Sequence, residues 1–228
     1  MNLPSATVGT PALHRGLALL VAGLLGACPA WAAPADVQHG AAIAAQGVPP
    51  AVAACVTCHG AKGEGGPGFP PLAGQGASYL REQLDAFADG TRANAIMAPI
   101  AKGLDAPARA DVAAWFASLP SGIAPQAAGP ADPKDQGAWL VERGRWADGI
   151  PACASCHGPG GAGVGEHFPA LARLGAAYMQ AQIDAWKSGQ RPPGPLGLMQ
   201  GIAKKLSHDD ISAVAQYYAS RPPSAGQP

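Results

Sequence analysis

The sequence predicts an all-α protein that contains two tandem copies of one small domain. Three observations support this prediction: a long internal repeat, apolar residues at helical spacing in both copies, and no segment in which apolar and polar residues alternate. Gly and Pro account for 31 and 24 of the 228 residues, and aromatic residues for only 6%. Each copy of about 85 residues therefore has few large side chains for a core, and a prosthetic group would supply the missing apolar mass.

Residues 1–32 are predicted to be a signal peptide and not part of the fold. His14 and Arg15 precede an apolar run, Leu17–Ala27, which is too short to span a bilayer as a helix, and the small residues around Trp31 offer a cleavage site. No later segment is long and apolar enough to span a membrane, so we expect an exported, periplasmic chain without a transmembrane segment.

Cys28 offers an alternative to this cleavage. The segment Leu25–Cys28 loosely resembles a bacterial lipobox, and cleavage before Cys28 would leave a lipid-anchored N-terminus. The intact mass of the mature protein separates the two alternatives. Peripheral association with the membrane is open to either form.

The internal repeat covers nearly all of the chain after the signal peptide. We place a first domain at residues 33–120, a linker rich in Pro, Gly and Ala at residues 121–135, and a second domain at residues 136–228. The repeated segments are Cys55–Gly60 with Cys153–Gly158, Gly68–Arg92 with His167–Arg191, and Met97–Leu104 with Met199–Leu206.

The two copies are expected to contain the same helices in the same order. A first helix is expected before each C-x-x-C pair, near residues 37–46 and 138–147. The middle helices have apolar residues at i, i+4 and i+7: Leu80, Leu84 and Phe87 in one copy, Met179, Ile183 and Trp186 in the other. The last helices contain Val112–Leu119 and Ile211–Tyr218, with start signals at Asp105 and at Ser207 with Asp210.

The four cysteines that follow the signal peptide form two C-x-x-C pairs, and a histidine directly follows each pair. The sets are Cys55, Cys58 and His59, and Cys153, Cys156 and His157. C-x-x-C-H is the signature of c-type haem attachment, in which the thiols add to the haem vinyl groups and the histidine binds the iron. A zinc site would need pairs about 15–20 residues apart, a thioredoxin-like site would need strands, and disulfides would not explain the histidines. We therefore predict two covalently bound haem c groups with histidine as the proximal ligand.

Met97 and Met199 are predicted to be the second iron ligands. They occupy equivalent positions in the repeat, in Pro- and Gly-rich stretches, and a thioether raises the reduction potential of a haem relative to stronger donors. Met179 aligns with an apolar residue of the other copy and is predicted to pack in the core. The rival ligands have no counterpart in the other copy and are interpreted as surface residues: His39, His167 and His208.

Two further repeated pairs have candidate roles near the haems. Pro70 and Pro169 offer a backbone carbonyl that would accept the Nδ1 proton of the histidine in the same copy; the alternative is that they only shape a turn. Arg92 and Arg191 are either partners of haem propionates or solvated ends of helices, and the sequence favours neither interpretation.

The charge balance argues against a nucleic-acid-binding protein, which needs an excess of basic residues. The chain has 15 basic and 15 acidic residues. Residues 33–120 hold seven acidic and five basic side chains, and residues 121–228 hold eight and nine, so the two domains would present partners with weakly different charge.

Together these motifs resemble the dihaem cytochrome c4 family of class I c-type cytochromes. The resemblance rests on CxxCHG, F-P-x-L-A, Y-[LM]-x-x-Q-[LI]-x-A-[FW]-x-x-G-x-R and M-x-x-I-A-K-x-L in both halves. It implies two His/Met haem domains related by a pseudo-two-fold axis, which carry electrons in the bacterial periplasm from quinol–cytochrome c oxidoreductase to a terminal oxidase. One departure is Leu171–Arg173, where the first copy has Leu72–Gln75, so we expect a loop of different shape near the second haem; another is a Pro-rich insertion before Met199.

We expect an electron carrier and not an enzyme. A dihaem peroxidase or a thiosulfate-oxidising dihaem cytochrome would need an open or cysteine-ligated iron, whereas the four cysteines are used for attachment and the two halves are alike. The alternative that the sequence leaves open is a cytochrome subunit of a larger dehydrogenase. The predicted partners are therefore redox proteins, and nucleic acid is not among them.

Overall fold

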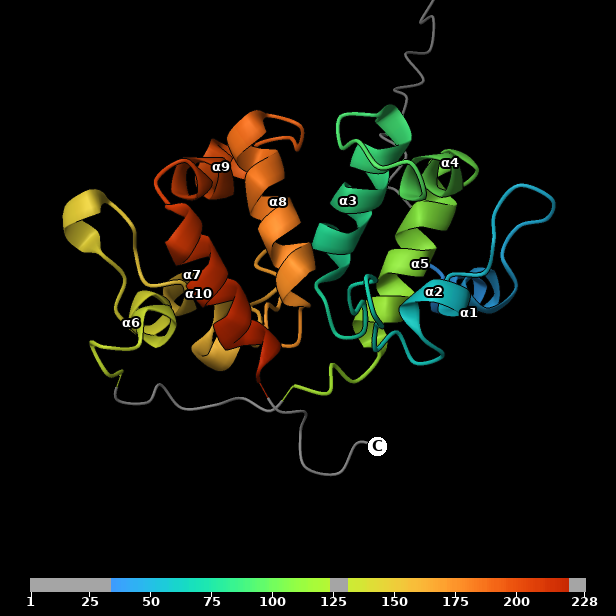
Figure 1. Cartoon of the computed structure of the whole chain (residues 1–228). Coiled ribbons are helices and arrows are strands. Elements are labelled where there is room, and N and C mark those ends of the chain that lie inside the picture. The colour runs from blue at the N-terminus through green and yellow to red at the C-terminus, as the bar shows by residue number, and fades with distance from the viewer. Residues whose placement is uncertain (1–33, 124–130, 222–228) are drawn as a thin grey trace, which may run out of the picture. The chain divides into compact units, whose positions relative to one another are not determined.

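The computed structural model describes residues 34–123 and 131–221 (Figure 1). Within these ranges the regular structure is helical, with isolated β-bridges only, so the predicted all-α fold is confirmed. The predicted signal peptide, Cys28 and residues 124–130 of the predicted linker lie outside the described residues. No helix in the described ranges is long and apolar enough to cross a bilayer.

The α-helices occur in the same order in the two halves. The first half contains α1 (Val37–Gln46), α2 (Val56–His59), α3 (Ala77–Asp89), α4 (Met97–Lys102) and α5 (Ala106–Ser118). The second half contains α6 (Gln136–Glu142), α7 (Ala154–His157), α8 (Ala176–Ser188), α9 (Leu198–Ala203) and α10 (His208–Ala219). Three short 3₁₀ helices lie between them in the second half: Trp146–Asp148, Pro159–Gly161 and Pro195–Gly197.

The expected helix boundaries agree with the structure at α1 and differ at α6. The sequence predicted a helix near residues 138–147, but α6 ends at Glu142. Gly144 then takes a left-handed conformation with φ 72°, and Arg145 pairs with Ile150 in an isolated bridge. The chain therefore reverses direction within the range where a continuing helix was expected.

The predicted start signals of the last helices are present. The Asp105 carboxylate accepts a hydrogen bond from the Ala108 N–H at 2.9 Å. Ser207 and Asp210 form a reciprocal capping box, in which each side chain accepts a hydrogen bond from the backbone N–H of the other, at 3.1 and 2.9 Å. Both α5 and α10 thus begin with a satisfied backbone donor.

In each half the first helix crosses the last helix at a glycine. A Cβ atom added to Gly40 on α1 would lie 2.1 Å from the carbonyl oxygen of Asp111 on α5. A Cβ atom added to Gly137 on α6 would lie 2.6 Å from the carbonyl oxygen of Ala213 on α10. Any larger residue would push these helices apart, so the glycines fix the closest approach in both cores.

Four of the six residues of the predicted apolar stripes are buried, and the other two are partly buried. Leu80 and Phe87 on α3, and Met179 and Ile183 on α8, are each at most 7% exposed. Met179 belongs to the core of the second half, so its predicted role in packing is confirmed.

One difference between the two cores is a single hydroxyl group. Phe116 on α5 and Tyr218 on α10 occupy equivalent positions and are 1% and 0% exposed. Among the described residues, none is placed to form a hydrogen bond with the buried Tyr218 hydroxyl. We expect Tyr218→Phe to raise the free energy of unfolding by about 1 kcal/mol, because an unsatisfied buried donor costs about 1–3 kcal/mol. Urea unfolding measures this change, with Phe116→Tyr as the control that should have the opposite sign.

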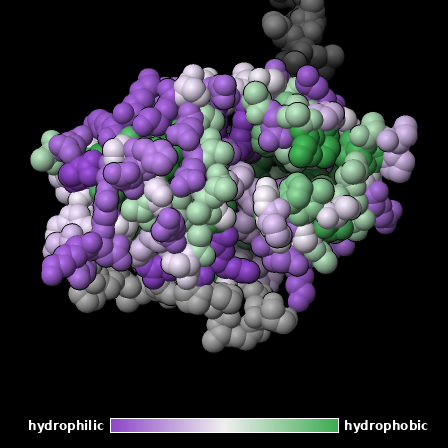
Figure 2. Space-filling view, viewed as in Figure 1, coloured by the Kyte–Doolittle hydropathy of each residue, from purple (hydrophilic) through white to green (hydrophobic). Residues whose placement is uncertain are grey.

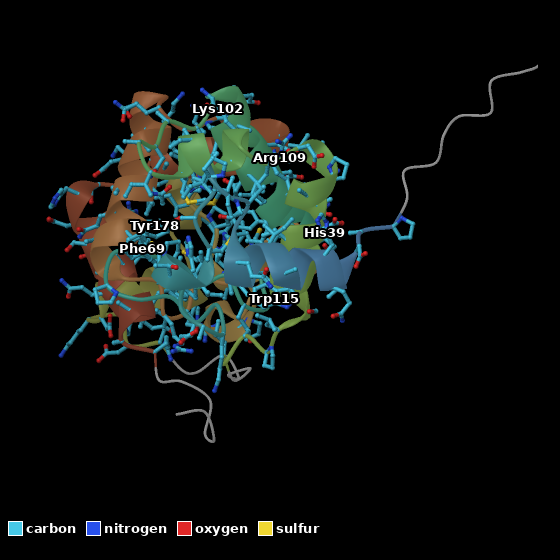
Figure 3. The ribbon with its side chains drawn as sticks, turned by 90° about the vertical axis from the view of Figure 1, so that its right-hand side faces the viewer. His39, Phe69, Lys102, Arg109, Trp115 and Tyr178 are labelled. Atoms are coloured by element: carbon cyan, nitrogen blue, oxygen red, sulfur yellow. The ribbon has the colours of Figure 1, made fainter. Side chains whose placement is uncertain are left out.

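A different ion pair joins the first and last helical regions in each half. In the first half, His39 Nδ1 lies 2.7 Å from Asp111 Oδ2 (Figure 3), and this hydrogen bond raises the pKa of His39. In the second half, the two terminal nitrogens of Arg145 donate to the two carboxylate oxygens of Asp210, both at 2.9 Å. The His39 side chain is 55% exposed, so its predicted place at the surface is confirmed, and it also pairs with Asp111.

The two halves meet where α3 faces α8 (Figure 1), and two buried arginines lie in this contact. Arg92 donates to the Tyr178 hydroxyl and Gln182 Oε1 at 3.1 and 2.6 Å, and Arg191 donates to the Tyr79 hydroxyl and Gln83 Oε1 at 3.3 and 3.0 Å. Arg92 and Arg191 are only 7% and 4% exposed, so their interpretation as solvated ends of helices is wrong. Each hydrogen bond from the first half to the second is matched by an equivalent hydrogen bond from the second half to the first, as expected for two repeats related by an approximate two-fold axis.

The loop at Arg173 keeps the backbone of its counterpart at Gly74. Their φ angles are 68° and 69°, and their N–H groups donate to the carbonyls of Tyr218 and Phe116 at 3.0 and 2.9 Å. The expected difference in loop shape is therefore wrong. Arginine accepts the left-handed conformation here, at a cost of about 1–2 kcal/mol for a residue with a Cβ atom.

Candidate haem sites

Each C-x-x-C-H segment forms a single helical turn that begins at its first cysteine. The His59 N–H donates to the Cys55 carbonyl at 3.0 Å, and the His157 N–H donates to the Cys153 carbonyl at 3.0 Å. This turn holds both thiols and the imidazole of a set on one short stretch of backbone. The arrangement is the one that c-type attachment requires.

None of the four cysteines in the described ranges forms a disulfide. Burial raises the pKa of the Cys55 thiol, and it raises the pKa of the Cys153 thiol to about 11. Both groups are therefore protonated at neutral pH, and thiols react with disulfides and oxidants far more slowly than thiolates. This chemistry is opposite to that of a thioredoxin-like pair, which depends on a thiol of lowered pKa.

The two histidines are buried, and their rings are fixed in the same way. His59 Nδ1 lies 2.9 Å from the carbonyl oxygen of Pro70, and His157 Nδ1 lies 2.8 Å from that of Pro169. These are the contacts that the sequence led us to expect. Burial lowers the pKa of both imidazoles, so each is neutral at pH 7 and carries its proton on Nδ1. Among the described residues no hydrogen bond engages Nε2, whose lone pair is therefore available to a metal.

Met97 and Met199 lie at the starts of equivalent helices, reached by different loops. Met97 is the first residue of α4, and its N–H donates to the Asn94 side chain at 2.8 Å. Met199 is the second residue of α9 and follows the 3₁₀ turn in which Leu196 has φ 59°. Both methionine side chains are half-buried. Despite the insertion in the second half, both methionines thus lie in the first turn of their helices.

The donor set fits a haem better than an isolated metal ion. In the part of the chain that the structure describes, no group of three or more His, Cys, Asp and Glu side chains is placed to hold an ion by itself. Each half instead offers two thiols, one imidazole nitrogen, one thioether and half-buried apolar side chains beside its core, among them Leu72 and Ile100 or Leu171 and Ile202. Apolar residues also gather at the surface of the first half on the side of α3 to α5 (Figure 2).

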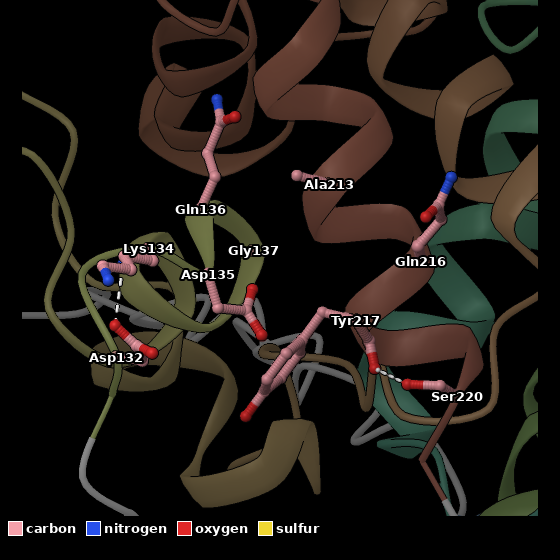
Figure 4. Close-up of a pocket in the computed structure, with 9 residues that line it drawn as sticks. All are labelled: Asp132, Lys134, Asp135, Gln136, Gly137, Ala213, Gln216, Tyr217 and Ser220. Carbon is pink, nitrogen blue, oxygen red and sulfur yellow. Dashed lines mark hydrogen bonds between the residues drawn. The ribbon is translucent and has the colours of Figure 1, made fainter.

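A separate groove of about 680 Å³ lies between α6 and α10 (Figure 4). Its lining is largely polar and includes Asp132, Lys134 and Tyr217, with no cysteine, histidine or methionine. This groove therefore has none of the donors of the candidate haem sites.

Comparison with known proteins identifies the family. A family model described as cytochrome c matches residues 37–120 and 150–221. The chain belongs to the cytochrome c family. The cytochrome is 46% identical over 214 residues to a thiosulfate dehydrogenase electron acceptor of Thiomonas intermedia, covering 92% of each chain. It is 40% identical over 186 residues to cytochrome c4 of Pseudomonas aeruginosa, covering 79% of this chain and 90% of that one.

Solved structures give the same result. The cytochrome superposes on thiosulfate dehydrogenase (TsdBA) of Marichromatium purpuratum with a TM-score of 0.71 and 37% identity, covering 82% of this chain but only 40% of that longer one. It superposes on reduced cytochrome c4 of Pseudomonas stutzeri with a TM-score of 0.68 and 33% identity, covering 82% and 100%. The predicted two-domain cytochrome c fold and the resemblance to cytochrome c4 are therefore confirmed. Its family and its cytochrome c4 relatives identify the chain as an electron-transfer protein.

Sequence reasoning missed the residues that join the two halves near these sites. Gln75 and Glu166 each bind backbone of the opposite half, across 95 and 88 residues of sequence. The one available signal was the loss of the Gly-Gln pair from the second repeat, which marked Gln75 as a difference between the halves without indicating its partner.

Proposed function

We propose that the cytochrome holds two covalently bound haem c groups and carries electrons in the periplasm from a thiosulfate-oxidising dehydrogenase toward a terminal oxidase. The observation that carries this proposal is the duplicated attachment turn, in which a buried histidine is fixed through Nδ1 and has Nε2 free. The thiosulfate-linked donor is supported by relatives at 46% and 44% identity that are both named thiosulfate dehydrogenase electron acceptor.

In this function the thiols attach each group and the histidines and methionines bind its iron. Cys55, Cys58, Cys153 and Cys156 would form the thioethers, His59 and His157 would bind through Nε2, and Met97 and Met199 would bind through sulfur. A bound haem c supplies a reversible one-electron change at its iron. Two protein ligands at each site would leave no open position at the iron, so we propose a carrier and not a catalyst.

Pro70 and Pro169 would hold the proximal imidazoles. A carbonyl that accepts the Nδ1 proton fixes the tautomer and the ring orientation, and it increases the basicity of Nε2. Each carbonyl reaches its histidine across a short loop of the same half, so the two sites are built independently at this point.

Arg92 and Arg191 have features that favour pairing with haem propionates over a purely structural role. Among the described residues, their side-chain hydrogen bonds all go to neutral tyrosine and glutamine side chains, and burial lowers the pKa of Arg191. A carboxylate close to these guanidinium groups would compensate their buried charge.

A second candidate donor is quinol–cytochrome c oxidoreductase, which the relation to cytochrome c4 supports. Export by the signal peptide at residues 1–32 would place the cytochrome in the compartment of either donor. The third arrangement, a permanent subunit of a dehydrogenase, is favoured by the longer TsdBA chain, of which the cytochrome spans 40%.

Stopped-flow reduction of the oxidised holoprotein tests these candidates. We expect thiosulfate with catalytic amounts of thiosulfate dehydrogenase to reduce both haems at least 10-fold faster than quinol with the oxidoreductase does. The control is thiosulfate without enzyme, which should leave the protein oxidised.

The reverse order of rates would assign the quinol-linked donor instead. Equal, slow rates with both donors would contradict a role in either pathway. Co-elution with the dehydrogenase at micromolar concentration on size exclusion would favour the subunit arrangement over a diffusing carrier.

A further inference from the structure

We infer that Gln75 of the first domain tunes the haem site of the second domain, by polarising the peptide group that binds His157. This inference rests on the proposed haem ligation by His157. It makes Gln75 a positioning residue that acts across the boundary between the two halves.

The Gln75 side chain makes two hydrogen bonds to one residue of the opposite half. Gln75 Oε1 accepts a hydrogen bond from the Ala170 N–H at 2.8 Å, and Gln75 Nε2 donates to the Ala170 carbonyl at 3.2 Å. Gln75 is 5% exposed and Ala170 is 3% exposed. Water therefore does not compete for these bonds, and in such surroundings a hydrogen bond is electrostatically stronger than in water.

The Ala170 N–H belongs to the same peptide group as the Pro169 carbonyl, which accepts the Nδ1 proton of His157 at 2.8 Å. Hydrogen bonds at the two ends of one amide polarise each other, since donation by the N–H increases the negative charge on the oxygen. A stronger acceptor at Nδ1 makes the imidazole a more basic ligand. A more basic ligand stabilises ferric iron relative to ferrous iron and therefore lowers the reduction potential of the haem. Hydrogen bonding to the ligands is one of the ways in which a protein tunes this potential.

The first site lacks this connection. Its acceptor is the carbonyl of Pro70, and the next residue is Pro71, which has no N–H to donate. Leu174 occupies the position of Gln75 in the second half and has no polar side-chain atom. The coupling therefore runs in one direction, from the first domain to the second site.

A second anchor holds the same loop and provides a matched control. The Glu166 carbonyl accepts a hydrogen bond from the Tyr79 N–H at 2.9 Å, and the Glu166 carboxylate accepts one from the Ser78 N–H at 3.0 Å. Glu166 thus ties the loop to the start of α3 without touching the peptide between Pro169 and Ala170. Loss of the Glu166 carboxylate removes a hydrogen bond between the two halves, but it does not change the polarisation of the peptide between Pro169 and Ala170.

The test uses the haem-loaded protein and the variants Gln75→Leu and Glu166→Ala. Spectroelectrochemical titration gives the two midpoint potentials, and NMR of the reduced protein assigns them and reports the Nδ1–H resonance of each proximal histidine. We expect Gln75→Leu to raise the potential of the second haem only, and to move the His157 Nδ1–H resonance upfield while that of His59 stays in place. Glu166→Ala should leave both potentials and both resonances unchanged.

Other results would overturn the inference. Unchanged potentials in Gln75→Leu, equal shifts of both haems, or the same shift in Glu166→Ala would each show that Gln75 does not act through the Pro169 peptide. If Gln75→Leu does not fold, Gln75→Met, which has a similar length and only a weak acceptor in place of the amide oxygen, gives the same comparison. A wild-type protein with fewer than two covalent haems would instead contradict the proposed function, and the pyridine haemochrome count separates that failure from this one.

Discussion

Met97→Ala should leave the first haem with a single protein ligand, lower its reduction potential and open it to carbon monoxide. Met199→Ala should do the same at the second haem. Axial ligands set haem potentials over roughly 0.8 V, so we expect a fall on the order of 0.1 V or more when water replaces the thioether. Carbon monoxide added to the fully reduced protein, followed by its visible spectrum, measures the opening directly.

The wild-type protein and Met179→Leu are the controls for this experiment. Met179 is 5% exposed in the core of the second half, and its replacement by leucine conserves volume, so it should change stability by less than about 1.5 kcal/mol. Neither control should bind carbon monoxide. Binding of carbon monoxide to one haem of the wild-type protein would instead indicate an open iron and would favour an enzymatic function. Unchanged oxidised spectra of Met97→Ala and Met199→Ala would show that other residues bind the iron.

The features that were predictable from the sequence are those that depend on neighbouring residues. The apolar spacing located α3 and α8, Asp105 and Ser207 marked the starts of α5 and α10, and the C-x-x-C-H motifs located the turns of the candidate haem sites. Each of these signals is contained within about ten residues, because helix hydrogen bonds and caps join residues close in sequence.

The features that were not predictable depend on contacts between residues distant in sequence, or on an unusual backbone conformation that a residue with a side chain adopts. Arg92 was open to two interpretations because nothing near it indicated that Gln182 of the other half would bind it. The loop at Arg173 kept its shape because arginine accepted a left-handed φ, which a residue preference alone does not indicate. The bonds of Gln75 to Ala170 likewise span 95 residues, and a single sequence contains no signal that pairs them.

Asp210→Ala should reduce the stability of the second domain by about 3 kcal/mol, the lower end of the range for breaking a buried ion pair. Asp210 is 1% exposed and accepts hydrogen bonds from Arg145, Gln136 and the Ser207 N–H. The loss should stay at the lower end because the Arg145 side chain is 39% exposed and regains water when its partner is removed. Thermal unfolding followed at the haem absorption bands measures the change.

Asp148→Ala is the matched control, because Asp148 also binds Arg145 but its side chain is 56% exposed. Its replacement should cost less than about 1 kcal/mol, as is typical of surface ion pairs. Equal losses in the two variants would contradict a special role for the buried carboxylate.

The two domains should also respond to pH in opposite directions. Arg145 holds the pKa of Asp210 well below its usual range, so the stability from this carboxylate is present above about pH 4, the ordinary value for aspartate, and is lost as the pH falls further. In the first domain, Asp111 raises the pKa of His39, so the stability from that pair is present below about pH 6.5 and is lost as the pH rises through the raised value. His39→Gln should remove the decline of the first domain at rising pH and leave the acid sensitivity of the second domain intact. If His39→Gln left the alkaline decline of the first domain unchanged, the His39–Asp111 pair would not be its cause.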